Sequence, residues 1–160
     1  LQRIFKTVGD LDGKPNRHCG LHIHIGTFPP TREVLLQAAA YFHRHPLAKL
    51  AGTSPRRQKK QCAAIDRTLL EDFATIELDQ LKGLSSAFAT GEHNYHRQRE
   101  VNVLSLLKFG TIEYRMFAST LDAAQALAAI DWCLALTDAC MHDLDLPLPT
   151  GILPPAIDER

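Results

Sequence analysis

The stretch HCGLHIHIG, residues 18–26, is an apolar run that contains two histidines placed two residues apart. Its side chains alternate, so that His22 and His24 occupy one side of the chain and apolar residues occupy the other. The apolar side consists of Leu21, Ile23 and Ile25. This period of two predicts a β-strand over residues 19–26 with one face against a core. The strand presents its two imidazoles on the second face, roughly 7 Å apart.

A second alternating stretch, TIEYRMFA at residues 111–118, also predicts a strand. One of its faces is expected to carry Thr111, Glu113, Arg115 and Phe117. If both strands belong to one sheet, the histidines and the carboxylate can serve together as metal ligands. An arginine beside them is suited to a phosphate or carboxylate, because its planar fork binds such groups through two hydrogen bonds. The two strands together predict a metal–phosphate site on the face of a sheet.

The rest of the chain predicts helices between loops, which gives a single domain of mixed α+β class. Helices are expected over residues 31–44, 55–74, 75–88 and 122–143; loops over 9–18 and 90–100; a short strand or helix over 101–107; and an extended proline-rich tail over 147–160. In the last helix, one apolar side is expected to contain Leu127, Ile130, Leu134, Thr137 and Met141, and Trp132 is expected in the core.

Composition limits the classes of partner. The 160 residues are 45% hydrophobic, and 18 Lys and Arg balance 18 Asp and Glu, so the overall charge indicates neither nucleic acid nor an acidic membrane surface. The sequence has neither an apolar run long enough to span a membrane nor a signal peptide. The cysteines lack zinc-site spacing and are expected to be reduced thiols of a cytoplasmic protein; they are Cys19, Cys62, Cys133 and Cys140.

The motif CGLHIHIG, followed by NVLSLLKFGTIEYRMFAST, resembles the amidoligase family of the glutamine synthetase and glutamate–cysteine ligase superfamily. Members show a Cys-Gly-Leu-His-x-His-x-Gly strand, and later an Asn before a Gly-Thr-x-Glu-[Phe/Tyr]-Arg-x-Phe strand. The resemblance covers roughly residues 16–132. It implies a glutamine synthetase-like fold, in which a curved, mainly antiparallel sheet carries helices on one face. It also implies an ATP-dependent carboxylate–amine ligase, in which an acyl phosphate is captured by an amine.

Carried over by position, the resemblance assigns roles to the residues of both strands. His22 and Glu113 would hold Mg²⁺ or Mn²⁺, and Arg115 would stabilise the transferred phosphoryl group. His24 would lie nearby, at the substrate. The residues implied for the ATP or substrate pocket are Arg99, Asn102 and Arg115. The expected substrates are a small-molecule or peptide carboxylate and an amine.

The sequence departs from the family in one respect. The family carries a Gly-x-Glu-x-Glu strand near its N-terminus that supplies most of the metal carboxylates, and this sequence, which starts at Leu1, has none. We therefore expect residues 1–160 to be the C-terminal part of one catalytic domain. The alternatives are a homologue that has lost catalysis, and a site completed by a second copy in a homo-oligomer.

Two other functions stay open from the sequence. A zinc-dependent hydrolase could use the His-x-His pair with Glu113, and it would bind zinc without nucleotide. A non-catalytic binding or assembly domain could satisfy the same histidines in its core. Two polar clusters are expected to be ordinary solvated surface: the basic run Arg56, Arg57, Lys59 and Lys60, and the loop group Glu92, His93 and His96.

Overall fold

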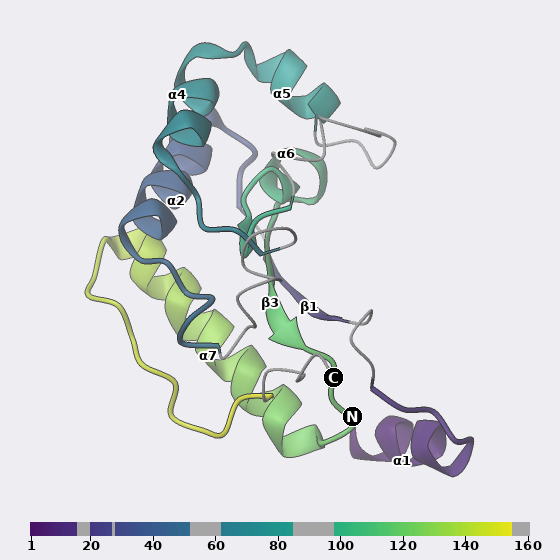
Figure 1. The fold of residues 1–160 in the computed structure, drawn as a ribbon. Coiled ribbons are helices and arrows are strands. Elements are labelled where there is room, and N and C mark those ends of the chain that lie inside the picture. Colours follow the sequence, from purple (N-terminus) through teal and green to yellow (C-terminus); the bar gives the residue numbers. More distant parts are fainter. Residues whose placement is uncertain (16–19, 27, 52–61, 85–97, 155–160) are drawn as a thin grey trace.

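A computed structural model describes residues 1–15, 20–26, 28–51, 62–84 and 98–154 of the chain (Figure 1). Its elements in chain order are α1 (Gln2–Asp10), β1 (Gly20–Gly26), α2 (Arg32–Arg44), α4 (Arg67–Thr75), α5 (Leu78–Leu84), β2 (Val101–Asn102), α6 (Ser105–Phe109), β3 (Thr111–Ala118) and α7 (Ala123–His142). The predicted mixed α+β class is confirmed. No helix in these described ranges is both long and apolar enough to cross a membrane.

The three strands form one antiparallel sheet in the order β1-β3-β2. Both predicted strands are confirmed, and the central strand β3 has the predicted bounds. The segment predicted as a short strand or helix over 101–107 contains both, because β2 ends at Asn102 and α6 begins at Ser105. The site strands β1 and β3 are therefore direct neighbours.

A β-bulge interrupts the pairing of β1 with β3. Leu21 pairs with Phe117 and Ile23 pairs with Tyr114, so two β3 residues lie opposite His22. Strict alternation placed Phe117 on the face of Glu113, and this prediction is wrong. The extra residue shifts the alternation, and the Phe117 ring packs edge-on against Trp132 of α7 at 6.1 Å between centroids.

The core lies where α2 and α7 pack together along one side of the sheet (Figure 1). Tyr114 of β3 joins the layers: its ring contacts Phe42 of α2 edge-on, and its hydroxyl lies 2.8 Å from Thr137 Oγ1 of α7. Both helices begin where predicted, because the side chains of Thr31 and Asp122 accept hydrogen bonds from backbone N–H groups of the first turn. This arrangement leaves the other face of the sheet for the histidines.

The helix predicted over 55–74 begins later than expected. Residues 52–61 lie outside the described ranges, and residues 62–66 are not helical. Ala63 instead forms a β-bridge with Arg99, and Asp66 caps the start of α4 by accepting from Leu69 N at 2.9 Å. A long-range backbone contact therefore overrides the local helical pattern. The next predicted helix, 75–88, is described only as α5.

The N-terminal helix α1 was not predicted, and it takes the first two residues of the loop expected over 9–18. Ile4 and Val8 of this helix, and Leu1 directly before it, remain exposed, and Phe5 is partly exposed. No residue of α1 is buried. The apolar residues Leu1, Ile4, Phe5 and Val8 follow the spacing of an amphipathic helix, so the local pattern could have predicted α1.

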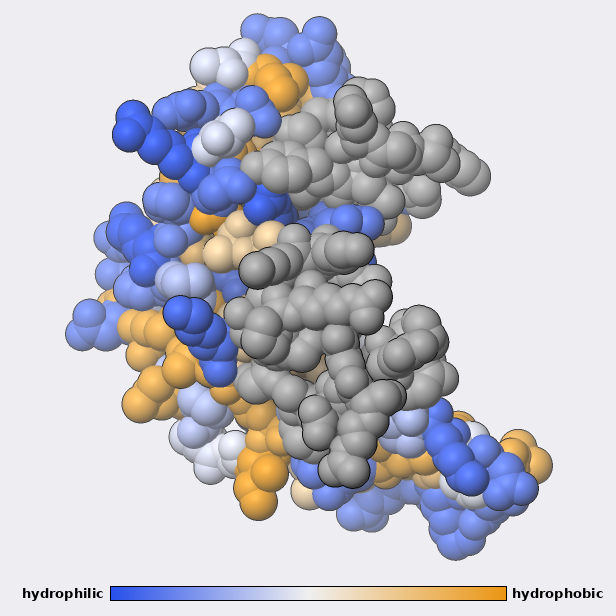
Figure 2. Space-filling model, in the orientation of Figure 1, coloured by the Kyte–Doolittle hydropathy of each residue, from blue (hydrophilic) through white to orange (hydrophobic). Residues whose placement is uncertain are grey.

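The core-facing side of α7 differs from the prediction. Of the predicted apolar side, Leu127 and Leu134 are 47% and 50% exposed, whereas Thr137 is buried and Ile130 and Met141 pack against the core. The buried residues of the helix are Ala123, Ala126, Ala129, Trp132, Cys133, Leu136, Thr137, Ala139 and Cys140. The helix is apolar around most of its circumference, so periodicity does not select one face. Figure 2 shows the exposed apolar residues gathered over α7 and the tail; they are Leu127, Leu134, Leu144, Leu148 and Ile152.

Candidate functional site

The four strand residues predicted for the site come together on the sheet face opposite the helix core. His24 pairs directly with Glu113, and the bulge places His22 opposite Arg115 and Met116. The two histidine side chains are 39% and 40% exposed, whereas the Glu113 side chain is 7% exposed. A buried carboxylate thus lies beneath two accessible imidazoles.

Glu113 is the centre of the polar contacts. Its Oε1 lies 3.0 Å from His22 Nδ1, accepts a hydrogen bond from Arg115 Nη1 at 3.0 Å, and lies 3.8 Å from His24 Nε2. Its Oε2 accepts from Asn102 Nδ2 at 2.7 Å. The site therefore combines groups from all three strands of the sheet.

These contacts decide the charge of Glu113. Burial alone would raise the pKa of its carboxyl group, but the hydrogen bonds from His22 and Asn102 and the positive charge of Arg115 outweigh burial and lower the pKa to about 2. The carboxylate is consequently ionised at neutral pH. A buried, ionised carboxylate is a strong ligand for a cation or for a proton donor.

A second set of contacts holds His24 in place through its other ring nitrogen, Nδ1. Nδ1 lies 3.0 Å from Thr111 Oγ1, which lies 2.9 Å from Ser105 Oγ. The ring of Phe109 also meets the imidazole edge-on, with 6.1 Å between centroids. The orientation of His24 is therefore set by α6 and the first residue of β3, two places that the sequence analysis did not assign to the site.

One known family matches most of the chain. Residues 6–137 match a family described as "Putative amidoligase enzyme". The chain belongs to this amidoligase family. Searches of the curated proteins and of the solved structures found no match. The match includes every candidate residue of the site and supports a ligase-type function in general terms.

The amidoligase pocket residues predicted outside the two site strands divide into two cases. Asn102 is 3% exposed and bonded to Glu113, so it belongs to the site. Its Oδ1 is buried without a hydrogen-bond partner among the described residues. Arg99 is also 3% exposed, but its Nη1 donates to the Ala64 carbonyl at 2.8 Å and to Asp66 Oδ2 at 3.2 Å. The structure brings Arg99 to the start of α4, not to Glu113.

A second glutamate next to the amidoligase site escaped sequence reasoning. Glu100 is fully buried, and its carboxylate oxygens accept from Leu47 N at 2.9 Å and Ala48 N at 2.6 Å. Burial raises its pKa to about 7, although the two hydrogen bonds act in the opposite direction. Its backbone carbonyl accepts from Arg115 N at 2.8 Å. Glu100 lies in a polar stretch expected to be a loop, and no local pattern distinguishes it.

The donor set of the candidate site suits a cation only in part. Two ligands at right angles on an ion with bonds of about 2.1 Å lie about 3 Å apart, and His22 Nδ1 and Glu113 Oε1 are 3.0 Å apart. One carboxylate with an imidazole suits Mn²⁺ better than Mg²⁺. Across the described parts of the chain, no three His, Cys, Asp or Glu side chains are grouped closely enough to hold a metal ion. Any cation there needs further oxygen ligands, such as phosphates or water.

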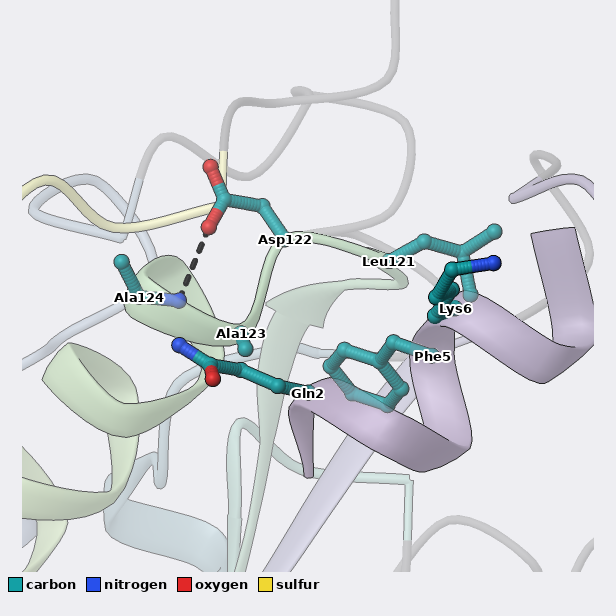
Figure 3. A pocket seen from close by; sticks show the side chains of 7 residues that line it. All are labelled: Gln2, Phe5, Lys6, Leu121, Asp122, Ala123 and Ala124. Carbon is teal, nitrogen blue, oxygen red and sulfur yellow. Dashed lines mark hydrogen bonds between the residues drawn. The ribbon is translucent and has the colours of Figure 1, made fainter.

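A separate pocket of about 380 Å³ lies between α1 and the start of α7 (Figure 3). Its lining residues are Gln2, Phe5, Lys6, Leu121, Asp122, Ala123 and Ala124. The Asp122 carboxylate is occupied as the cap of α7, accepting from Ala124 N at 2.8 Å. The pocket shares no residue with the candidate site.

The other polar clusters noted in the sequence, Arg56 to Lys60 and Glu92 to His96, lie outside the described residues, as does Cys19. The described cysteines are buried thiols; they are Cys62, Cys133 and Cys140.

Proposed function

We propose that this chain carries the site of an ATP-dependent carboxylate–amine ligase. The observation that carries the proposal is Glu113, an ionised carboxylate held between His22, Arg115 and Asn102 on a sheet face in a member of the amidoligase family. An anionic ligand for a cation lies directly beside a guanidinium suited to phosphate. This pairing is what a reaction on a nucleotide phosphate requires.

The proposed reaction proceeds in two steps. The substrate carboxylate attacks the γ-phosphate of ATP to form an acyl phosphate and release ADP, and an amine then displaces inorganic phosphate and loses a proton to form the amide. The Arg115 side chain is 20% exposed and keeps one nitrogen on Glu113. Its positive charge would stabilise the phosphoryl group during transfer.

His22 and Glu113 would hold a divalent cation, Mn²⁺ or Mg²⁺, together with oxygen atoms of the nucleotide. The cation would neutralise the negative charge of the nucleotide phosphates. Asn102 fixes the second carboxylate oxygen of Glu113, so that Oε1 faces the histidines. His24 would contact the substrate, with its Nε2 towards Glu113.

We also propose that this chain supplies only part of the metal ligands. Glu113 is the one carboxylate among the described residues that touches His22, and ligases of this class bind ATP with several carboxylates. The others would come from a segment outside residues 1–160 or from a second copy of the chain. The same experiment, repeated with such a segment attached, tests this part of the proposal.

Calorimetric titration with Mn-ATP and Mg-ATP tests the function directly. Glu113→Gln keeps the size of the side chain and removes its charge, so nucleotide affinity is expected to fall at least tenfold. Glu71→Gln is the matched control, because Glu71 is an exposed glutamate of α4 bonded to Arg67. This control is expected to bind nucleotide as the unmodified chain does.

The titration also separates the three functions. Binding of Mn-ATP that depends on Glu113 supports the ligase. Stoichiometric zinc binding without nucleotide indicates the hydrolase. If neither binds, even after the chain is extended with the acidic strand of the family, the ligase proposal is wrong and a non-catalytic domain is the better description.

A further inference from the structure

The side chain of Glu100 joins the turn that follows α2 to the sheet. Its carboxylate oxygens accept hydrogen bonds from Leu47 N at 2.9 Å and Ala48 N at 2.6 Å. The Leu47 carbonyl in turn accepts from Leu50 N and Ala51 N, so the two N–H groups lie at the start of a single helical turn. Glu100 and Leu47 are fully buried. A carboxylate that holds two adjacent N–H groups also fixes its own position, because both oxygens are engaged.

The peptide group of Glu100 holds the site strand from the same place. Its N–H donates to the Ala63 carbonyl at 2.9 Å, and its carbonyl accepts from Arg115 N at 2.8 Å. Because Val101 of β2 pairs with Tyr114, Glu100 lies opposite Arg115 as the next residue of the antiparallel register. One residue therefore connects three segments: the turn after α2, the segment before α4, and β3.

Arg115 lies where β3 has lost its regular pairing with β1. The bulge takes Arg115 out of the register of these two strands. Its backbone N–H donates to Glu100, and its carbonyl accepts from the Cys62 thiol at 3.1 Å. Its side chain keeps Nη1 at 3.0 Å from Glu113 Oε1. The position of the guanidinium therefore depends on contacts outside the pairing of β1 with β3.

We propose that Glu100 is a positioning residue for Arg115: its carboxylate fastens the turn at residues 47–51 to the sheet, and its peptide group holds the Arg115 backbone at the bulge. Without the carboxylate, two buried N–H groups would lose their acceptor and this side of Arg115 would lose its anchor. The benefit to the reaction rests on the proposed ligase, in which Arg115 meets the phosphoryl group. The coupling itself is a property of the chain without nucleotide, and it is measured separately.

Amide hydrogen exchange of the ¹⁵N-labelled chain, followed by NMR without nucleotide, tests the coupling. Glu100→Met keeps the approximate size of the side chain and removes both acceptor oxygens. We expect the amides of residues 47–48 and of Arg115 to lose about tenfold or more protection beyond any loss at the Leu136 amide, which lies in the buried face of α7. Glu100→Gln keeps one acceptor oxygen and is expected to give an intermediate loss. Glu71→Gln, in an exposed position of α4, is the control and is expected to change none of these amides.

A loss of protection that is equal at Arg115 and Leu136 overturns the proposal, because Glu100 would then serve only the stability of the fold. If Glu100→Met fails to fold, Glu100→Gln decides by the same comparison.

Titration with Mn-ATP supplies a readout at the site itself. We expect Glu100→Gln to bind the nucleotide about threefold or more weakly than the unmodified chain, because Arg115 is no longer held in place. Equal affinity overturns the positioning role. Failure of Mn-ATP to bind, even to a chain extended with the acidic strand of the family, would contradict the ligase and leave the exchange result unaffected.

Discussion

Two buried glutamates, Glu113 and Glu100, respond to burial in opposite ways. Glu113 has Arg115 and His22 beside it, and its pKa falls to about 2. Glu100 accepts only two neutral backbone N–H groups, and its pKa rises to about 7. At Glu113 the side-chain hydrogen bonds from His22 and Asn102, together with the charge of Arg115, outweigh the loss of water, whereas at Glu100 the two backbone hydrogen bonds do not.

The opposite pKa shifts of Glu113 and Glu100 predict that the protein is most stable in mild acid. The pKa of Glu113 is lowered on folding from 4.5, so its contribution is present above pH 4.5 and is lost as pH falls towards about 2. The pKa of Glu100 is raised on folding from 4.5, so its contribution is present below pH 4.5 and is lost as pH rises to about 7. Urea unfolding at a series of pH values measures both effects.

Glutamine variants separate the two contributions. Glu113→Gln is expected to remove the loss of stability between pH 4.5 and 2, and Glu100→Gln the loss between pH 4.5 and 7. Each variant leaves the other limb of the profile in place. A Glu100→Gln profile that still declines like that of the unmodified chain up to pH 7 would contradict the assignment of that limb to Glu100.

Gly110 is a residue whose backbone conformation matters to the site. Its φ of +66° is a left-handed conformation that favours glycine, and a Cβ added here would lie 3.2 Å from the Phe28 carbonyl oxygen. Gly110→Ala is expected to lower the free energy of unfolding by about 1–2 kcal/mol. Gly9→Ala in α1 is the control, because a Cβ there meets nothing within 4 Å. Chemical denaturation should show that this control is neutral or up to about 1 kcal/mol more stable.

Among the secondary-structure elements, α7 offers the clearest test of which face is buried. Leu136 is fully buried and Leu134, two residues earlier, is 50% exposed. Leu136→Ala is expected to cost about 2–5 kcal/mol because it leaves a cavity, whereas Leu134→Ala is expected to cost less than about 1 kcal/mol. Denaturant midpoints of the two variants measure the difference. Equal losses would mean that the apolar side expected from periodicity is also buried.

The strands were predictable because each has one polar face. The pairing of β1 with β3 is regular from Thr111 to Tyr114 and shifts only at Arg115 and Met116, so His22, His24, Glu113 and Arg115 could be placed on one surface from the sequence. The bulge that moved Phe117 to the other face leaves no local signal. The helices were harder to place, since α7 is apolar all round and the start of α4 depends on a bridge between Ala63 and Arg99.

In the molecule as a whole, the groups that sequence reasoning missed are those whose role arises from distant contacts. The Glu100 carboxylate accepts a hydrogen bond from the backbone after α2, and the Ser105 hydroxyl contacts Thr111, which contacts His24. Each is an ordinary polar residue in its local sequence. Arg99, which the family resemblance places in the pocket, contacts Asp66 at the start of α4 in the structure.

Trp132, the only tryptophan of the chain, connects the core to the C-terminal tail. It is 3% exposed, and its Nε1 donates to the Pro147 carbonyl at 2.8 Å. We therefore expect the tail and the core to unfold together, with the same urea midpoint from tryptophan fluorescence and from far-UV circular dichroism. A lower midpoint by fluorescence would show that the tail detaches first.

The pairing of β1 with β3 joins parts of the chain that are far apart in sequence, since the contact between His24 and Thr111 spans 87 residues. During synthesis, a ribosome releases β1 long before β3 exists, so the nascent chain exposes an apolar strand edge without its partner. Closing so long a loop makes this pairing a slow event in folding. The candidate site is thus assembled by one of the last contacts to form, and a bound ligand would protect the chain at the point where it would otherwise reopen.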